Sequence, residues 1–164
     1  MYIGDISDLD DCLRFTSNID IVLHTAAYKH VELCELSPNN AVRNNIVGTQ
    51  NLISASIKNK VKKFIFTSSD KAVNPTNVMG STKLLAERLV SSANLKDKNS
   101  TIFASTRFGN ILGSRGSVLT IFEKQFSLKQ PFTITDLKMT RYVMTLEKAC
   151  KLVLKSVEQA KGGE

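Results

Sequence analysis

The chain has 164 residues, of which 42% are hydrophobic and 23% charged, a composition that fits one globular domain and excludes a disordered chain. No apolar run approaches the roughly 18 residues that cross a membrane, and no secretory signal is visible, so we expect neither a membrane segment nor export. The net charge of +7 fits a lysine-rich surface, a phosphate-bearing substrate or nucleic acid.

The first predicted elements are a strand and a long helix. Residues 20–27, DIVLHTAA, form a short continuous apolar run that ends in small residues, which is typical of a strand buried on both faces. Residues 37–60 are predicted to form one helix, because Ser37 suits an N-cap and Pro38 suits the first helical position. Apolar residues at three-to-four spacing give this helix one face for a sheet.

Strands and helices continue to alternate along the rest of the chain. Strands are expected at 61–69, 100–110 and 131–135, and helices at 80–96, 117–128 and 145–160, followed by a frayed tail, KGGE. This order implies βαβ units and therefore an α/β fold, a partial Rossmann-like and mostly parallel sheet flanked by helices. We interpret residues 1–164 as a single domain.

The polar segments that follow the strands are the expected site. Ligands of parallel sheets bind at the carboxyl ends of the strands. Residues 25–29, 68–71 and 107–110 lie at the carboxyl ends of the first three predicted strands and are unusually polar for their surroundings. We therefore expect the functional side chains to come from these three segments.

A glycine-rich turn is missing from the expected place. A dinucleotide-binding sheet normally opens with GxGxxG or GxxGxxG, which holds pyrophosphate at a helix N-terminus. The only glycine cluster here, Gly109, Gly113 and Gly116, follows the third predicted strand instead. We therefore expect that the first, NAD-binding βαβ unit is missing and that the chain is a fragment.

Neither the cysteines nor the histidines form a recognisable site. Cys12, Cys34 and Cys150 are odd in number and irregularly spaced, which favours free thiols in a reducing, cytoplasmic location. His24 is expected to be a strand histidine whose hydrogen bonds are satisfied within the protein. His24 and His30 are too few ligands for a metal site, so no metal is predicted. No aromatic residues interleave with the lysines, so no nucleic-acid partner is expected.

Four stretches of the sequence carry a family resemblance. They are DIVLHTAAYKHVELCELSPNNAVRNNIVGTQN, FTSSDKAVNPTNVMGSTKLLAE, RFGNILGSRGSV and TITDLKMTRYVMT. Together they resemble the nucleotide-sugar 4,6-dehydratases of the CapD-like polysaccharide biosynthesis family, which are extended short-chain dehydrogenase/reductases. The resemblance implies NAD-dependent 4,6-dehydration of a UDP-N-acetylhexosamine, such as UDP-N-acetylglucosamine, in polysaccharide or glycan biosynthesis. It also implies a homo-oligomer for the full-length form.

The resemblance assigns the catalytic step to residues 69–71. Removing water from a sugar requires a base and an acid near adjacent carbons, and an Asp-Lys pair at a strand end supplies both. By family analogy, Lys71 would be the base at C5 and Asp70 the acid for the C6 oxygen. Ser69 would hydrogen-bond near O4.

The resemblance also implies residues that bind the cofactor and the substrate. For NAD these are Asp5, Ile6, Ala26, Ala27, Lys29, Asn45 and Lys83, with Lys83 on the nicotinamide ribose. For the UDP-sugar they are Asn110, Thr133, Thr135 and Arg141. The resemblance further implies that residues 1–164 form a single partial dinucleotide-binding and catalytic domain, in which 111–145 contribute to the nucleotide-sugar site. Lys29 and His30 are weaker candidates for contact with the substrate.

Met79 occupies the place of the tyrosine in the Tyr-xxx-Lys pair of many relatives. A thioether cannot accept or relay a proton, so Met79 is interpreted as a packing residue. Deprotonation of the O4 hydroxyl is then assigned to Ser69 or Asp70. The context NPTNVMGSTK favours retention at C5 over inversion.

Two alternatives to a complete dehydratase are left open. One is a related nucleotide-sugar epimerase or reductase, against which the Ser-Asp-Lys motif and Met79 argue. The other is a catalytically incomplete fragment, a split half or a binding remnant. Because the phosphate-binding turn is absent, we expect the isolated 164-residue chain to bind NAD poorly and to turn over little.

Overall fold

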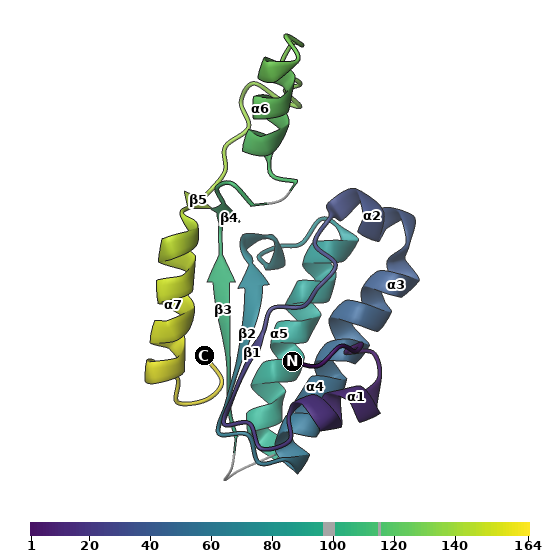
Figure 1. Cartoon of the computed structure of the whole chain (residues 1–164), viewed down its shortest axis with the longest axis vertical. Helices are drawn as coiled ribbons and strands as arrows, with labels where there is room; N and C mark the ends of the chain where they lie inside the picture. The colour runs from purple at the N-terminus through teal and green to yellow at the C-terminus, as the bar shows by residue number, and fades with distance from the viewer. Residues whose placement is uncertain (97–100, 115) are drawn as a thin grey trace.

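A computed structural model describes residues 1–96, 101–114 and 116–164, with only the backbone described for Lys96. At its centre lies a parallel sheet in the order β1-β2-β3, formed by β1 (Ile21–His24), β2 (Lys63–Ser69) and β3 (Ile102–Phe108) (Figure 1). The register places Ser68 beside Arg107 and Ser69 beside Phe108, so β2 and β3 end at the same edge.

The helices form layers on both sides of this sheet. Helix α7 packs against β2 and β3 on one side, and α5 with α4 and α1 lies on the other (Figure 1). The helices are α1 (Leu9–Phe15), α2 (Val31–Leu36), α3 (Pro38–Val42), α4 (Thr49–Lys58), α5 (Val78–Lys96), α6 (Val118–Ser127) and α7 (Leu146–Gln159), with a π-helix η1 (Arg43–Gly48) and a 3₁₀ turn η2 (Asp70–Ala72). Among the described residues, no helix is both long and apolar enough to span a bilayer.

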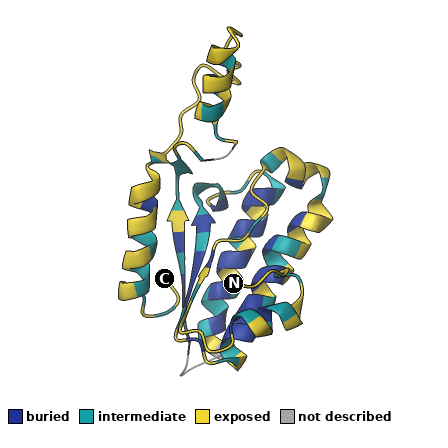
Figure 2. Cartoon of the chain, viewed as in Figure 1, coloured by how far each residue is buried: buried dark blue, intermediate teal, exposed yellow. Residues whose placement is uncertain are grey.

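The core lies between β2, β3 and the α4–α5 layer. Phe64, Phe66 and Phe103 are almost completely buried, and the rings of Phe64 and Phe103 lie 5.3 Å apart. Each buried phenylalanine contributes about 1.5–3 kcal/mol relative to an exposed one. Figure 2 shows the same pattern, with buried residues concentrated on β2, β3 and the inner side of α5.

The first predicted strand is shorter and less buried than expected. It covers 21–24 instead of 20–27, and Ile21 and Leu23 are each 44% exposed. The expectation of a strand buried on both faces was therefore wrong for β1. The reason is its position at the edge of the described sheet, where α7 contacts β2 and β3 but does not cover the outer face of β1.

The long helix expected at 37–60 is divided into α3, the π-helix η1 and α4. Thr49 Oγ1 donates to the backbone carbonyl of Asn45 at 2.7 Å, at the point where η1 meets α4. Gly48 allows Ile6 to pack directly on this turn, because a Cβ there would lie 2.7 Å from Ile6 Cδ1. Wide π turns inside helices are common at functional sites.

Residues 112–142 form an arm that leaves the sheet region and returns to it. At the base of the arm, β4 (Asn110–Ile111) pairs in parallel with β5 (Val143–Met144). Helix α6 lies within the arm and stands away from the three-stranded sheet (Figure 1), and it has no buried residue. The third predicted strand, 100–110, is therefore β3 followed by β4 in a separate sheet, with residue 100 outside the described residues.

Three further expectations need correction or addition. The strand expected at 131–135 is absent, because this described segment has no partner strand and Thr133 N donates to the Gln125 side chain instead. The tail is not frayed: Gly163 N donates to Phe103 O and Ser105 N to Glu164 O, which holds the tail along β3. Helices α1 and α2 have no counterpart among the expected elements, because they are too short to show a clear helical period.

Candidate active site

Ser69, Asp70 and Lys71 lie where β2 ends and η2 begins. Ser69 Oγ accepts a hydrogen bond from Lys71 N at 3.2 Å and donates one to Asp70 Oδ1 at 2.9 Å, so it acts as the N-cap of the turn. Lys71 Nζ donates to the same Asp70 Oδ1 at 3.2 Å. The side chains of Asp70 and Lys71 are 27% and 30% exposed, so both can be reached from outside.

Asn110 joins this group from a distant part of the chain. Its side-chain Oδ1 accepts a second hydrogen bond from Lys71 Nζ, at 3.0 Å. We call Ser69, Asp70, Lys71 and Asn110 the polar cluster. It combines a carboxyl group, an amine, a hydroxyl and an amide, which are groups suited to move protons to and from a hydroxylated substrate.

Lys83 on α5 is buried against β2. Its Nζ donates to the backbone carbonyl of Thr67 at 2.9 Å and lies 4.5 Å from the centroid of the Phe66 ring. Burial lowers the pKa of Lys83 to about 8, against the charge of Glu87, which raises it. A buried, hydrogen-bonded lysine at the carboxyl end of a strand fits a ligand-binding position better than a surface lysine does.

Asn45 connects the loop after β1 to α5. Its Oδ1 accepts from Tyr28 N at 2.8 Å, and its Nδ2 donates to Tyr28 O at 3.0 Å and to Thr82 Oγ1 at 2.9 Å. Asn45 is 2% exposed, so these contacts satisfy an otherwise costly buried amide. Asn45 therefore holds the loop containing Ala26, Ala27 and Lys29 against the helix that carries Lys83.

His24 lies in the core and has no access to a ligand. It packs against Phe64 and Phe66, with ring centroids 5.9 and 5.3 Å apart, and it hydrogen-bonds to Thr49. Burial, assisted by the charge of Lys83, lowers the pKa of His24 to about 3. The interpretation of His24 as a satisfied strand histidine is confirmed.

Met79 is buried against Cys34 and Ala41, with Val31 and Val78 around them. Only 4% of its surface is exposed, so it packs α5 against α2 and α3. The interpretation of Met79 as a packing residue is confirmed.

The loop after β1 lines a surface cavity of about 520 Å³ together with α2 and α3. Ala27, Lys29 and His30 are among its lining residues, but Ser69, Asp70 and Lys71 are not. Gly116 approaches His30 so closely that a Cβ would lie 3.0 Å from His30 Cε1. The base of the arm therefore meets the loop after β1.

The other predicted residues make contacts outside the polar cluster. Asp5 accepts from Ser7 N at 2.8 Å, and this bond lowers the pKa of Asp5. Ile6 packs on Gly48. Thr133 bonds to Gln125, Arg141 donates to Thr140 O at 2.9 Å, and Thr135 is exposed, so none of these three is hydrogen-bonded to the polar cluster.

An ion pair that sequence reasoning missed lies next to Lys83. Arg107 at the end of β3 donates two hydrogen bonds to Glu87 on α5, at 2.8 and 2.7 Å. Burial works to raise the pKa of Glu87, but the hydrogen bonds and charge of Arg107 outweigh it and lower this pKa. Helical spacing from Lys83 to Glu87 is the signal that places both on one face of α5.

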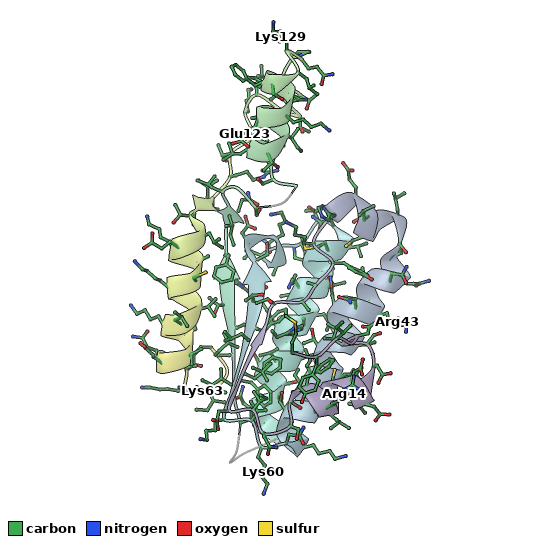
Figure 3. All side chains as sticks on the ribbon, in the orientation of Figure 1. Arg14, Arg43, Lys60, Lys63, Glu123 and Lys129 are labelled. Carbon is green, nitrogen blue, oxygen red and sulfur yellow. The ribbon has the colours of Figure 1, made fainter. Side chains whose placement is uncertain are left out.

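Positive charge is not concentrated at the polar cluster. Arg14, Lys60 and Lys63 lie toward the end of the molecule opposite the arm, on which Glu123 and Lys129 lie (Figure 3). Of the basic side chains labelled in Figure 3, some thus lie at one end of the molecule and Lys129 at the other.

Comparisons with known proteins agree on one family. A family model described as "Polysaccharide biosynthesis protein" matches residues 1–164. An uncharacterized membrane protein, MJ1061, of Methanocaldococcus jannaschii is 53% identical over 99% of this chain and 49% of its own length. The chain therefore spans about half the length of this curated relative.

Two further relatives have names that specify an activity. The UDP-N-acetylglucosamine 4,6-dehydratase (inverting) of Campylobacter jejuni is 42% identical over 99% of this chain and 49% of its own length. A UDP-glucose 4-epimerase of Rickettsia canadensis is 41% identical over 99% of this chain and 48% of its own length.

Solved structures confirm the fold. Pen from Bacillus thuringiensis matches with a TM-score of 0.96 and 52% identity, over 99% of this chain and 52% of that one. DesIV, a dTDP-glucose 4,6-dehydratase from Streptomyces venezuelae solved with NAD, matches with a TM-score of 0.90 and 17% identity, over 98% of this chain and 55% of that one. The partial Rossmann-like α/β fold expected from the sequence is thus confirmed.

Proposed function

Since the chain belongs to the polysaccharide biosynthesis protein family, we propose that it carries the acid–base residues of an NAD-dependent UDP-N-acetylhexosamine 4,6-dehydratase. The polar cluster is the observation that supports this proposal most. Lys71 and Asp70, the proposed base and acid, are hydrogen-bonded to each other at the carboxyl end of β2. Removal of water requires a base and an acid near adjacent carbons, and this pair supplies both. A dehydratase among the relatives, 42% identical, supports the same reaction class.

The residues of the polar cluster can share the proton transfers. Bound NAD would oxidise the sugar at C4 and return the hydride at C6. As C4 is oxidised, Asp70 would take the proton of the O4 hydroxyl and give it to the departing C6 hydroxyl, which leaves as water. Lys71 Nζ, 3.2 Å from Asp70 Oδ1, would remove the C5 proton and return a proton to C5 when the hydride reaches C6. Ser69 Oγ, whose one hydrogen goes to Asp70 Oδ1, would accept a hydrogen bond from the O4 hydroxyl.

Several residues of this chain fit the nicotinamide half of NAD. Lys83 offers a buried amine at the carboxyl end of the sheet, and the loop with Ala26 and Ala27 carries no large side chain there. Asn45 holds this loop in place through Tyr28. Lys29 would contact the ribose or the sugar. The sequence contains no glycine-rich turn for the pyrophosphate, and we propose Asp5 and Ile6 only as neighbours of the adenosine half.

The arm is proposed to hold the nucleotide part of the substrate. Arg141 presents an exposed guanidinium, which binds phosphate oxygens in pairs, while Thr133 and Thr135 would line the uridine. Asn110, the member of the polar cluster that begins β4, connects the cluster to this segment. We therefore assign residues 111–145 to the nucleotide-sugar site.

We further propose that the configuration at C5 is retained. The support is Met79, a buried apolar residue at the position where a tyrosine could otherwise take part in proton transfer. The Campylobacter jejuni relative is named as inverting, so the stereochemistry must be measured separately from the dehydration.

The test uses the protein that carries these 164 residues in its natural chain. It is incubated with NAD⁺ and UDP-N-acetylglucosamine in deuterated water, and the products are identified by NMR and mass spectrometry. A 4-keto-6-deoxy product with deuterium at C5 is expected, and the signal of H5 gives the configuration. Lys71→Ala should abolish C5 exchange, whereas Lys62→Ala, a surface control, should not.

The epimerase alternative predicts a different product. The Rickettsia canadensis relative, named an epimerase, is the observation in its favour. Formation of the C4 epimer without loss of water would remove the dehydratase proposal. Normal C5 exchange in Lys71→Ala would remove Lys71 from the mechanism.

A further inference from the structure

Lys71 Nζ is held by two acceptors of different chemistry. One is the Asp70 carboxyl oxygen at 3.2 Å, and the other is the Asn110 amide oxygen at 3.0 Å. A lysine side chain is a flexible four-carbon stem, so a single acceptor leaves its amine free to move around that acceptor. Two acceptors on different segments define one position for the amine.

The two acceptors behave differently during an acid–base reaction. Asp70 must gain and lose a proton if it is the acid, and its protonated form has less capacity to accept from Lys71. The amide of Asn110 does not titrate, so its oxygen accepts throughout the cycle. Asn110 can therefore keep the amine in place while the charge of Asp70 changes.

The backbone of Asn110 is in turn held by the returning end of the arm. Asn110 N donates to Tyr142 O at 2.7 Å, and Leu112 N donates to Met144 O at 2.9 Å. The preceding Gly109 makes this close approach possible, because a Cβ there would lie 2.6 Å from Tyr142 O. The position of Asn110 therefore depends on the β4–β5 pair as well as on β3.

We propose that Asn110 is a positioning residue for Lys71, and that the arm sets its position through the β4–β5 pair. The expected effect on kcat rests on the proposed function, in which Lys71 is the C5 base. The positioning of the Lys71 amine by Asn110 does not depend on that function. The rival role for Asn110, direct contact with the sugar, predicts weaker substrate binding instead of a displaced amine.

The first measurement needs no catalytic activity. The protein that carries these residues is trace-labelled with acetic anhydride, and acetylation of Lys71 is compared with that of Lys62 by mass spectrometry of peptides. Lys62 is a suitable reference, because its side chain is 75% exposed. Asn110→Ala should increase the Lys71 to Lys62 ratio about threefold, since the amine loses one of its acceptors. Asn110→Asp keeps an acceptor oxygen in place and adds a negative charge that favours the protonated amine, so it should return the ratio to the wild-type value or below it.

The second measurement is kinetic. Asn110→Ala should lower kcat for C5 exchange by about ten- to a hundredfold, as displacement of a catalytic group by about 1 Å does. The dissociation constant for the UDP-sugar should stay within about twofold of wild type, because the contact that is lost joins two protein groups. Gly109→Ala, which displaces Asn110 through Tyr142, should change labelling and kcat in the same direction. If Asn110→Ala does not fold, Asn110→Ser, whose hydroxyl is too short to reach Lys71, takes its place.

The possible outcomes separate the two proposals. An unchanged labelling ratio in a folded Asn110 variant overturns the positioning role, and so does weaker sugar binding at unchanged kcat. If the wild-type protein performs no dehydration while the labelling ratio still rises, the proposed function fails and the positioning of Lys71 by Asn110 stands.

Discussion

The Nε2 atom of His24 lies 2.9 Å from Thr49 Oγ1, and that hydroxyl donates its hydrogen to the carbonyl of Asn45 at 2.7 Å. Because the only hydrogen of the hydroxyl is used, Thr49 must accept from His24, so Nε2 of His24 carries a proton. A buried histidine of the core thus supports the π turn that carries Asn45.

This pairing predicts a loss of stability in acid. The pKa of His24 is about 3 in the folded chain, against 6.5 ordinarily, so between these values the unfolded chain binds a proton that the folded chain does not. The free energy of unfolding should fall as pH falls below 6.5, by about 1.4 kcal/mol per pH unit until about pH 3. Denaturant titrations at pH 7 and pH 4.5 measure it.

His24→Gln is the matched control, since its amide can still donate to Thr49 but does not titrate. It should lose about 2 kcal/mol less than wild type between pH 7 and pH 4.5. Parallel losses in the two proteins would show that His24 is protonated without cost.

Lys83 is predicted to cost stability at neutral pH. Its pKa is lowered to about 8 from 10.5, so the folded state disfavours the charged amine, and stability should rise with pH between these two values. Lys83→Met should raise the free energy of unfolding at pH 7 by about 1–2 kcal/mol, after allowance for the lost bond to Thr67 O. The gain should shrink at pH 10, where the lysine of the folded protein is neutral. A gain that does not change with pH would contradict this account.

Met79 should tolerate a change of shape better than a change of size. Met79→Leu keeps the volume in the pocket formed with Cys34 and Ala41 and should cost less than about 1.5 kcal/mol. Met79→Tyr overfills that pocket and should cost about 1–3 kcal/mol. Thermal melts compare the two, and a more stable tyrosine variant would show that the position has room for the ring.

Gly109 and Gly113 form a contrasting pair at the base of the arm. A Cβ at Gly109 would collide with Tyr142 O, whereas one at Gly113 meets nothing within 4 Å. The backbone N–H of Asn110 donates to Tyr142 O. Its hydrogen exchange should be about tenfold faster in Gly109→Ala, because a loss of about 1.4 kcal/mol in the free energy of local opening raises the exchange rate tenfold. Gly113→Ala should leave that N–H protected and should lower the stability only through the strain of an alanine at the positive φ of 71°. Equal exchange in both variants would count against the close contact.

Lys60 is a site where glycine should stabilise the protein. It follows α4 with a φ of 57°, and the bonds Lys60 N to Ile57 O and Val61 N to Ser56 O form a Schellman motif. Lys60→Gly should raise the free energy of unfolding by about 0.5–1 kcal/mol, because glycine adopts this conformation without strain. Lys60→Ala is the control and should give no gain in the same denaturant titration.

Much of the fold could be predicted because its signals are local. The apolar run of β2, the Ser37-Pro38 start of a helix and the alternation of strands with helices all depend on neighbouring residues. The expected strand at 131–135 failed for the opposite reason: an apolar, β-prone segment becomes a strand only if a partner strand lies beside it. The buried environment expected for β1 failed because coverage by a helix is not a local property.

The candidate site divides in the same way. The sequence alone places Ser69, Asp70 and Lys71 together, since they are consecutive at the end of a strand, and parallel strands collect their carboxyl ends at one edge. The family resemblance also indicates Lys83 and Asn45. Tertiary structure alone decides that Asn110, 39 residues from Lys71, is bonded to its amine, and that Asn45 bonds to Tyr28 and Thr82. These contacts depend on how separate segments pack, because hydrogen bonds of about 3 Å form only between groups that the whole fold brings together.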